Sequence, residues 1–313
     1  MVSFVPQHMG SGDSVQARDT ESVIESITPE LPDGVKFSIV GADTFVRVES
    51  RSHEVQVNGY ENEPYIRINK SGRVQVNDSS QTTFLNSNRY GNIDLSNFKK
   101  SDTPKWRTIA TNGVAMWHDH RSHWMNPIRP ATIDDRGTVL KWSVPVVVDG
   151  AKTTISGTLY LRAQASGAWW FVAFVSLLAA CVLAVKKPRA MRGVVIAISL
   201  CGVVVGAQEF AGLPSGARIT PILLLFSLGA FLLAAAARIG NRWRMPAHVS
   251  AALSAGAGAA LLVAVWQCVG QVRAAYIPGL TDMWTARATL TAMVGVGIVA
   301  IADAFLRITK SAE

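Results

Sequence analysis

Cysteine is scarce in this sequence and absent from its polar first half. The three cysteines lie in apolar stretches of the second half: Cys181, Cys201 and Cys268. Neither a disulfide framework nor a zinc site with thiolate ligands can therefore form in the first 165 residues. A segment of that length can bury an adequate core without disulfides, so their absence does not argue against export.

The sequence also lacks the short motifs that carry common enzyme chemistry. It contains no nucleophile elbow, no phosphate-binding loop and no dinucleotide fingerprint. Their absence favours a protein that is not an enzyme.

Acidic residues are few in the second half, which explains the net charge of +8. From Ser166 onward there are 12 Lys and Arg against 4 acids, whereas the first 165 residues hold 18 of each sign. A basic chain often binds nucleic acid. Here the excess lies beside hydrophobic runs, so it indicates membrane orientation, and we expect no nucleic-acid partner.

Charge is missing from long apolar stretches in that half. Gly167–Val185 is 19 residues without a charge, long enough to cross the hydrocarbon core as a helix. Four further stretches are predicted to span the bilayer: Gly193–Leu213, Ile219–Ala237, Val249–Val269 and Ala288–Leu306. We predict a five-helix transmembrane domain over residues 166–308, with a tail at 309–313.

The cations in the short loops predict how the helices are oriented. If the first span runs from outside to inside, the inner segments carry nine Lys and Arg and the outer loops carry three. Cytoplasmic loops hold the excess of Lys and Arg in most membrane proteins. We therefore expect a multi-pass protein of the cell membrane, with its N-terminal half extracytoplasmic and its C-terminus cytoplasmic.

Export of so long an N-terminal segment needs a signal. Met1–Gln16 has no apolar core of the kind a signal peptide contains. We expect the natural start to lie upstream, with a signal peptide missing here; the alternative is a first span that acts as a reverse anchor.

The first half alternates apolar and polar residues with the period of a β-strand. Residues 1–27 are polar and are predicted to be a flexible leader. From Val35 the alternation recurs in about eight short runs separated by turn residues, and Asp149-Gly150 has the chemistry of a hairpin turn. The pattern predicts an extracytoplasmic, immunoglobulin-like β-sandwich over residues 28–165.

The densest chemistry of the chain is the string M-W-H-D-H-R-S-H-W-M. It holds three of the six histidines within six residues, between two thioethers. On a strand over Met116–His120, alternate side chains would share a face about 7 Å apart, close enough to share one ion. The candidate metal ligands are His118, His120, His123, Met116 and Met125. Imidazole with thioether suits copper, and zinc could bind through the histidines alone.

A structural interpretation of the same string stays open. Asp119 could orient a ligand histidine without itself binding the metal, or it could pair with Arg121. Trp117 and Trp124 could be core anchors, with the histidines bonded to loop backbone.

A second polar cluster runs from Gly59 to Tyr65. Glu63 beside a histidine could do acid–base chemistry. The alternative is a tight turn between strands, covered by Tyr60 and Tyr65, and we favour it.

These residues resemble a group of uncharacterised actinobacterial membrane proteins with an exported β-domain. The resemblance rests on four segments: Gly59-Tyr60, Glu63-Pro64-Tyr65-Ile66-Arg67, Phe84-Leu85-Asn86 and the W-H-D-H-R-x-H-W-M string of Trp117–Met125. It implies an exported domain and a cleaved signal peptide, and no activity. In architecture alone, the chain also loosely resembles exported copper-handling proteins that combine a β-sandwich with membrane helices.

Two hypotheses follow for function. The first is a non-enzymatic envelope protein, anchored in the lipid bilayer, whose sandwich binds an envelope protein partner. The second is a metal-handling protein that binds copper at the histidine cluster. A transporter is disfavoured because Glu209 and Asp303 lie near helix ends, not at mid-membrane.

Overall fold

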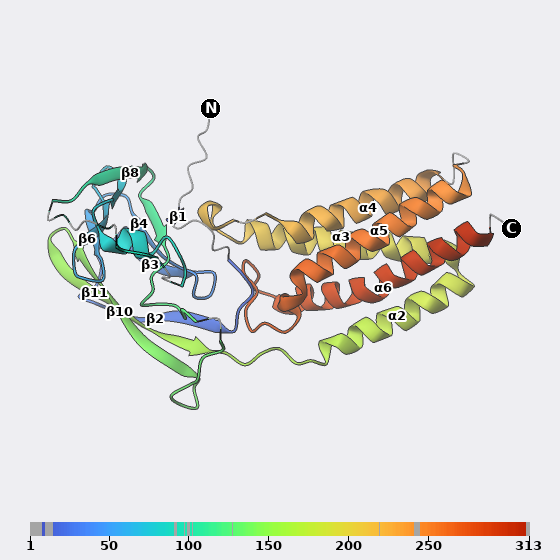
Figure 1. Ribbon diagram of the computed structural model, residues 1–313, viewed down its shortest axis with the longest axis horizontal. Helices are drawn as coiled ribbons and strands as arrows, with labels where there is room; N and C mark the ends of the chain where they lie inside the picture. Colours follow the sequence, from blue (N-terminus) through green and yellow to red (C-terminus); the bar gives the residue numbers. More distant parts are fainter. Residues whose placement is uncertain are drawn as a thin grey trace. The chain divides into compact units, whose positions relative to one another are not determined.

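The computed structural model describes residues 8–9, 15–90, 93–96, 98, 101, 103–126, 128–218, 220–240 and 245–310. The chain divides into two compact units, one rich in strands and one helical (Figure 1). The first unit is Met1–Ala163 with Leu213–Arg218, and the second is Gln164–Gly212 with Ile219–Glu313.

Two sheets build the first unit. The four-stranded sheet has the order β1 (His8–Met9), β9 (Val114–Trp117), β4 (Phe45–Ser50) and β3 (Val35–Val40). The seven-stranded sheet has the order β2 (Thr20–Thr28), β11 (Ala151–Leu161), β10 (Thr138–Val148), β5 (Val55–Asn58), β6 (Pro64–Ile68), β7 (Val74–Asn77) and β8 (Trp106–Ala110). Neighbouring strands run antiparallel except for β1 and β9, which pair in parallel. A short helix, α1 (Gln81–Leu85), follows β7.

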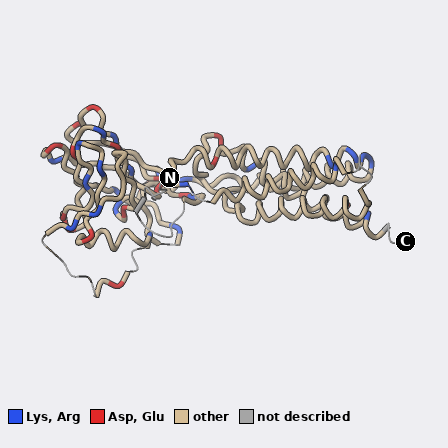
Figure 2. Tube along the Cα trace, turned by 90° about the horizontal axis from the view of Figure 1, so that it is seen from above, with Lys and Arg blue, Asp and Glu red and all other residues tan. Residues whose placement is uncertain are grey.

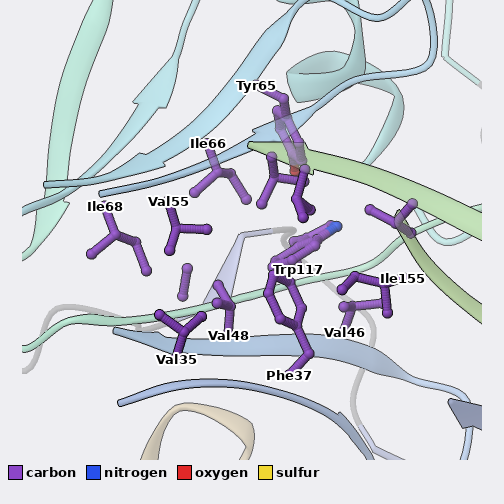
Figure 3. Packing of buried hydrophobic residues seen from close by; sticks show 14 of the residues in the cluster. Val35, Phe37, Val46, Val48, Val55, Tyr65, Ile66, Ile68, Trp117 and Ile155 are labelled. Atoms are coloured by element: carbon purple, nitrogen blue, oxygen red, sulfur yellow. The ribbon is translucent and has the colours of Figure 1, made fainter. Parts of the chain in front are cut away.

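The two sheets share one hydrophobic core. Val46 and Trp117 come from the four-stranded sheet, while Ile66 and Ile155 come from the other, and all four side chains are fully buried (Figure 3). Alternate residues of each strand point inward, which is why the valine-rich period of two predicts this core. Each buried side chain of this size stabilises the fold by about 1.5–3 kcal/mol. The two-sheet architecture predicted from the sequence is confirmed.

The hairpin between β10 and β11 turns where the sequence predicts. Asp149 and Gly150 occupy the loop, with φ of 47° and 85°. Glycine and aspartate tolerate this left-handed conformation, and their two-residue loop matches the twist of the strands.

The predicted leader, residues 1–27, is wrong at its C-terminal end. Residues 20–28 form β2, which pairs with β11 along its whole length. The β-rich unit therefore begins before the predicted boundary at residue 28. The pairing shifts between Ser156 and Gly157, a β-bulge that leaves Glu25 of β2 without a partner residue in β11. Ile24 and Ile27 can therefore both pack against the core although they are three positions apart. Residues 1–14, apart from the two backbone positions of β1, lie outside the described part of the chain.

Five helices of the second unit are long and apolar enough to cross a membrane. They are α2 (Trp169–Lys186), α3 (Pro188–Ala211), α4 (Ile222–Gly240), α5 (Ala247–Cys268) with its 3-10 continuation η3 (Val269–Val272), and α6 (Met283–Lys310). They overlap all five predicted spans and confirm a multi-pass membrane protein. Three of them begin earlier than predicted, at Pro188, Ala247 and Met283. The first and the last of these therefore include Arg189, Arg192 and Arg287.

Small residues let these helices approach closely. A Cβ atom at Gly258 of α5 would lie 2.7 Å from the carbonyl oxygen of Gly297 in α6. A Cβ atom at Gly295 would lie 2.3 Å from the backbone nitrogen of Leu177 in α2. Packing at this distance is how helices associate where no hydrophobic force acts between them.

Candidate functional site

The histidine string begins inside the four-stranded sheet and leaves it at Trp117. β9 lies between β4 and β1, and its last residue is Trp117. The chain then turns, with the backbone nitrogen of Ser122 donating to the carbonyl oxygen of Asp119 at 2.9 Å. The expected strand over Met116–His120 therefore ends three residues early, and alternation along a strand does not set the positions of His118 and His120.

Asp119 is the buried anchor of this turn. Its carboxylate accepts hydrogen bonds from Trp117 Nε1 at 2.9 Å and from Arg121 Nε and Nη2 at 2.8 and 2.7 Å. Burial alone would raise the pKa of Asp119, but the Arg121 guanidinium outweighs it, and the pKa lies below the usual range. The pairing of Asp119 with Arg121 expected on the structural interpretation is present.

Two tyrosines from the neighbouring turn close over this anchor. The guanidinium of Arg121 lies 5.0 Å from the centroid of the Tyr60 ring, a cation–π contact. Tyr60 Oη accepts from the backbone nitrogen of His120 at 2.8 Å and donates to Asn86 Oδ1. Tyr65 is fully buried and packs edge-on against Trp117, with centroids 6.4 Å apart. Burial raises the pKa of both tyrosines, so both hydroxyls stay protonated.

Glu63 has a structural role in this arrangement. Its carboxylate accepts from the hydroxyls of Ser80 and Thr82 at 2.5 and 2.7 Å and from the backbone nitrogen of Glu61 at 3.0 Å. These bonds hold the start of α1 against the turn between β5 and β6. The tight turn predicted over Gly59–Tyr65 is present: Gly59 N donates to Glu63 O at 2.7 Å.

The three histidines each bind a main-chain carbonyl through one ring nitrogen. His118 Nδ1 donates to Thr44 O at 2.7 Å, His120 Nε2 to Asn88 O at 2.9 Å, and His123 Nδ1 to Trp124 O at 3.2 Å. Because a carbonyl oxygen can only accept, the other nitrogen of each neutral ring carries the lone pair. This fixes the tautomer of all three rings in the way that metal-binding histidines are usually fixed.

The rings are neighbours. The centroid of His123 lies 5.3 Å from that of His120 and 6.2 Å from that of His118. His118 and His123 are each 1% exposed, and His120 is partly exposed. His123 Nε2 is buried and has no hydrogen-bond partner among the residues that the structure describes.

Burial keeps the rings of His120 and His123 uncharged. It lowers the pKa of His123 to about 3, with a further contribution from the Arg89 guanidinium, and it also lowers the pKa of His120. Both imidazoles are therefore neutral at physiological pH and able to offer a lone pair to an electrophile.

The two methionines of the string lie in different surroundings. Met116 is 1% exposed and packs in a small apolar cluster with Val15 and Phe45, and the Phe45 ring lies 4.4 Å from that of His118. Met125 is 37% exposed. In the described part of the chain, no group of three or more His, Cys, Asp or Glu side chains is already arranged around a common ion position.

A buried charge network beside the histidines has no counterpart in the sequence prediction. Asp43 is 1% exposed; it accepts from Thr20 Oγ1 at 2.8 Å, and both its oxygens lie 3.1 Å from Arg89 Nη2. Arg18 Nε lies 3.4 Å from the same carboxylate. Burial raises the pKa of Asp43, but these guanidinium groups lower it by more, and the net shift is downward. Local patterning does not identify Asp43 as a site residue, because its partner Arg89 is 46 positions away in the chain.

Most polar side chains of the site hold the turn in place, and the histidines are its reactive groups. Asp119, Arg121, Tyr60 and Glu63 are occupied in hydrogen bonds that hold the turn, and Tyr65 packs edge-on against Trp117. The ring nitrogens of His118, His120 and His123 that do not bind a main-chain carbonyl are the groups whose lone pairs could bind a ligand. Comparison with models of protein families, with curated proteins and with solved structures finds no match for this chain.

Proposed function

We propose that this chain is a membrane-anchored metal-binding protein whose β-rich unit lies outside the cytoplasm and takes up copper at His118, His120 and His123. The observation that carries the proposal is the buried, unpartnered Nε2 of His123 beside two further imidazoles of fixed tautomer. A buried nitrogen without a partner costs about 1–3 kcal/mol, which a bound ion would remove.

The histidine rings are not arranged around one ion in the structure, but their separations are small enough for a modest movement to bring them onto one. A bound imidazole nitrogen lies about 2 Å from its metal, so two rings on one ion have centroids roughly 5–6 Å apart. The observed 5.3 and 6.2 Å are close to this range. His120 is the ring best placed to adjust, because it is the most exposed of the three; it is held by a hydrogen bond to Asn88 O and by stacking on Tyr60.

The donor set favours copper. Neutral imidazole with thioether and no thiolate suits copper better than the hard cations magnesium or calcium. Met125, partly exposed at the end of the string, and Met116, buried near the Phe45 ring that contacts His118, are the thioether donors. Asp119 and Arg121 hold the turn that carries the ligands.

The placement of the unit outside the cytoplasm rests on the cations of the short loops. Nine lie on the side assigned to the cytoplasm and three on the other side. The resemblance to actinobacterial proteins with an exported domain supports the same orientation.

Metal titration of the purified full-length chain in mild detergent tests this function. We expect about one copper per chain for the wild type, and at least a tenfold weaker affinity for His120→Ala/His123→Ala. His53→Ala is the matched control. His53 binds Asp149 in the turn between β10 and β11 and is not one of the proposed ligands, so this variant should keep the copper affinity of the wild type. Negligible copper in the wild type, or equal affinity in all three proteins, would overturn the proposal.

A second function, partner binding without catalysis, is favoured by a different observation. Ile128 and Ile133 are 73% and 72% exposed on the segment that follows the histidine string. Trp124 Nε1 donates to the carbonyl oxygen of Ile128 at 2.7 Å, which ties this segment to the rigid turn. Ordered, exposed aliphatic side chains are suited to contact an apolar patch on an envelope protein.

Chemical crosslinking in native membranes separates this second function from the first. We expect Ile128→Ser/Ile133→Ser to lose a stoichiometric crosslinked protein while its copper affinity stays at the wild-type value. Phe84→Ser, which removes an apolar side chain 42% exposed elsewhere on the unit, should keep the crosslink. A wild-type chain that crosslinks to nothing would exclude this function.

A further inference from the structure

We propose that three arginines at one end of the helical unit, Arg192, Arg238 and Arg307, bind the phosphate of an anionic phospholipid. This end is formed by the start of α3 and the C-terminal ends of α4 and α6.

The three arginines come from three helices and lie close together. Arg238 Nη1 of α4 lies 3.6 Å from the position a Cβ atom would take at Gly193 of α3, so the guanidinium lies against the start of α3, next to Arg192 in the chain. Arg192 lies near enough to Arg189 and Arg238 to be repelled by both, and Arg307 near enough to be repelled by Arg192. Like charges held close together repel one another, and a bound anion would relieve that repulsion.

The described residues supply too little negative charge at this end. Asp303 is the one carboxylate there in the described part of the helices, and it pairs with Arg307. Among the side chains that the structure describes, the cations at this end are Lys186, Lys187, Arg189, Arg192, Arg238 and Arg307. Figure 2 shows Lys and Arg gathered at the end of the bundle nearest the C-terminus. A phosphate would balance the excess, and guanidinium groups bind phosphate with two parallel hydrogen bonds.

Arg192 itself has unused hydrogen-bonding capacity. Its Nε is buried and has no partner within the described ranges. The side chain lines a cavity of about 10 Å³ together with Ser254, Asp303 and Arg307. A cavity of this size holds about one water molecule. The phosphate therefore lies outside the cavity, against the exposed Arg238, with the terminal nitrogens of Arg192 and Arg307 as its further donors. The buried Nε of Arg192 does not reach it.

The surroundings of the arginines identify the anion as a lipid. Apolar side chains on the same helix ends face outward: Val185 is 84% exposed, Ile239 56%, Phe305 65% and Leu306 57%. A soluble anion would gain nothing from them, whereas the acyl chains of a phospholipid would cover them. Basic pockets between membrane helices are a known form of phospholipid recognition.

Lipid retention in full-length protein tests the site. The protein is purified in mild detergent, stripped of lipid, and titrated with phosphatidylglycerol or phosphatidylcholine while native mass spectrometry counts bound lipid. We expect a preference for phosphatidylglycerol that Arg192→Gln/Arg238→Gln lowers at least tenfold. Lys186→Gln/Lys187→Gln removes the same charge from the same end of the bundle and should change the affinity less than twofold.

Further arms separate a specific site from a general surface potential. Arg192→Lys/Arg238→Lys keeps the charge but loses the paired hydrogen bonds, and we expect it to bind more weakly than the wild type. Inorganic phosphate at millimolar concentration should not displace the lipid. Equal losses in the Arg→Gln and Lys→Gln variants, displacement by phosphate, or no preference between the two lipids would each overturn the proposal. Arg238→Gln alone, at an exposed position, gives the same test if the double variant does not fold.

Discussion

Asp119 is fully buried and carries a negative charge, and the Arg121 guanidinium with the Trp117 indole compensates it. Replacing Asp119 by Asn keeps the size of the side chain but leaves the largely buried Arg121 without its counter-charge. Breaking a buried ion pair from one side costs about 3–5 kcal/mol. We expect Asp119→Asn to lower the free energy of unfolding of the β-rich unit by about 3 kcal/mol, measured by urea unfolding of the full-length chain in detergent.

An exposed ion pair provides the control for this substitution. Asp78 pairs with Arg107 at 2.8 Å, and both side chains are more than a third exposed. Exposed pairs contribute little to stability, so Asp78→Asn should have a much smaller effect. Comparable destabilisation by the two variants would mean that the buried pair does not hold the turn.

The neutral imidazole of His123 makes stability depend on pH. Its pKa is about 3 in the folded protein, against 6.5 for a histidine side chain exposed to water. Between these values the unfolded chain binds a proton that the folded chain excludes, so stability falls as pH drops below 6.5. One proton gives a slope of up to about 1.4 kcal/mol per pH unit.

Unfolding of metal-free protein at pH 7 and pH 5 measures this slope. We expect His123→Leu to have a shallower dependence than the wild type over this range. Asp43 and Asp119 contribute only at lower pH, because a carboxylate with a lowered pKa loses its stabilisation below the ordinary value of 3.8. An unchanged slope in His123→Leu would show that the ring does not stay neutral.

At the scale of elements, the contact of β2 with β11 depends on one glycine. A Cβ atom at Gly157 would lie 2.2 Å from the carbonyl oxygen of Val23 and 2.3 Å from the indole of Trp142. Neither neighbour is the end of a flexible chain. Gly157→Ala should therefore separate the two strands and destabilise the unit by roughly 2 kcal/mol.

Urea unfolding and limited proteolysis near Thr20 both report on this contact. Gly150→Asn is the control, because Gly150 has open space around it and asparagine tolerates its positive φ. A Gly157→Ala variant as stable as the wild type would mean that β2 is not held by this pairing.

Local patterning predicts the strands in which one face alone is buried. The buried positions of β5 alternate with its polar residues, and the same holds for β4 from Val46 onward and for β7 as far as Val76. β2 breaks the pattern at its bulge, and β8 at the edge of its sheet has no fully buried residue. Both were absent from the sequence prediction, because burial of an edge strand depends on neighbours far away in the chain.

The candidate site, too, could be predicted from the sequence only in part. The sequence identifies the string and the pairing of Asp119 with Arg121, which are two positions apart. It does not predict where β9 ends, which depends on pairing with β4. It also does not predict the bonds of His118 to Thr44 and His120 to Asn88, 74 and 32 positions away. Those long-range bonds set the tautomers, so the chemistry of the rings needs the fold.

At the scale of the whole molecule, the five spans were predictable because a membrane helix is marked by length and composition alone. The approach of α5 to α6 at Gly258 follows from small residues within one segment, although the identity of the neighbouring helix does not. Orientation is a further property of the whole chain, set by the cations at the helix ends and not by any single contact.

Cysteine labelling on intact cells tests the orientation. Replacing Cys181, Cys201 and Cys268 by Ala provides a background without thiols. In it, we expect Lys152→Cys, exposed in β11 beside the hairpin turn, to react with a membrane-impermeant maleimide. Lys187→Cys, exposed between α2 and α3, should react only after the cells are opened.

The two positions have opposite expectations, so each is the control for the other. Both are exposed lysines, and the difference between them can come only from the membrane. If Lys187→Cys reacted on intact cells and Lys152→Cys were protected, the chain would have the opposite orientation in the membrane. The arginine-rich helix ends would then lie in the outer leaflet and the histidines in the reducing cytoplasm. Neither an extracytoplasmic copper site nor the assignment of the short-loop cations would survive that result.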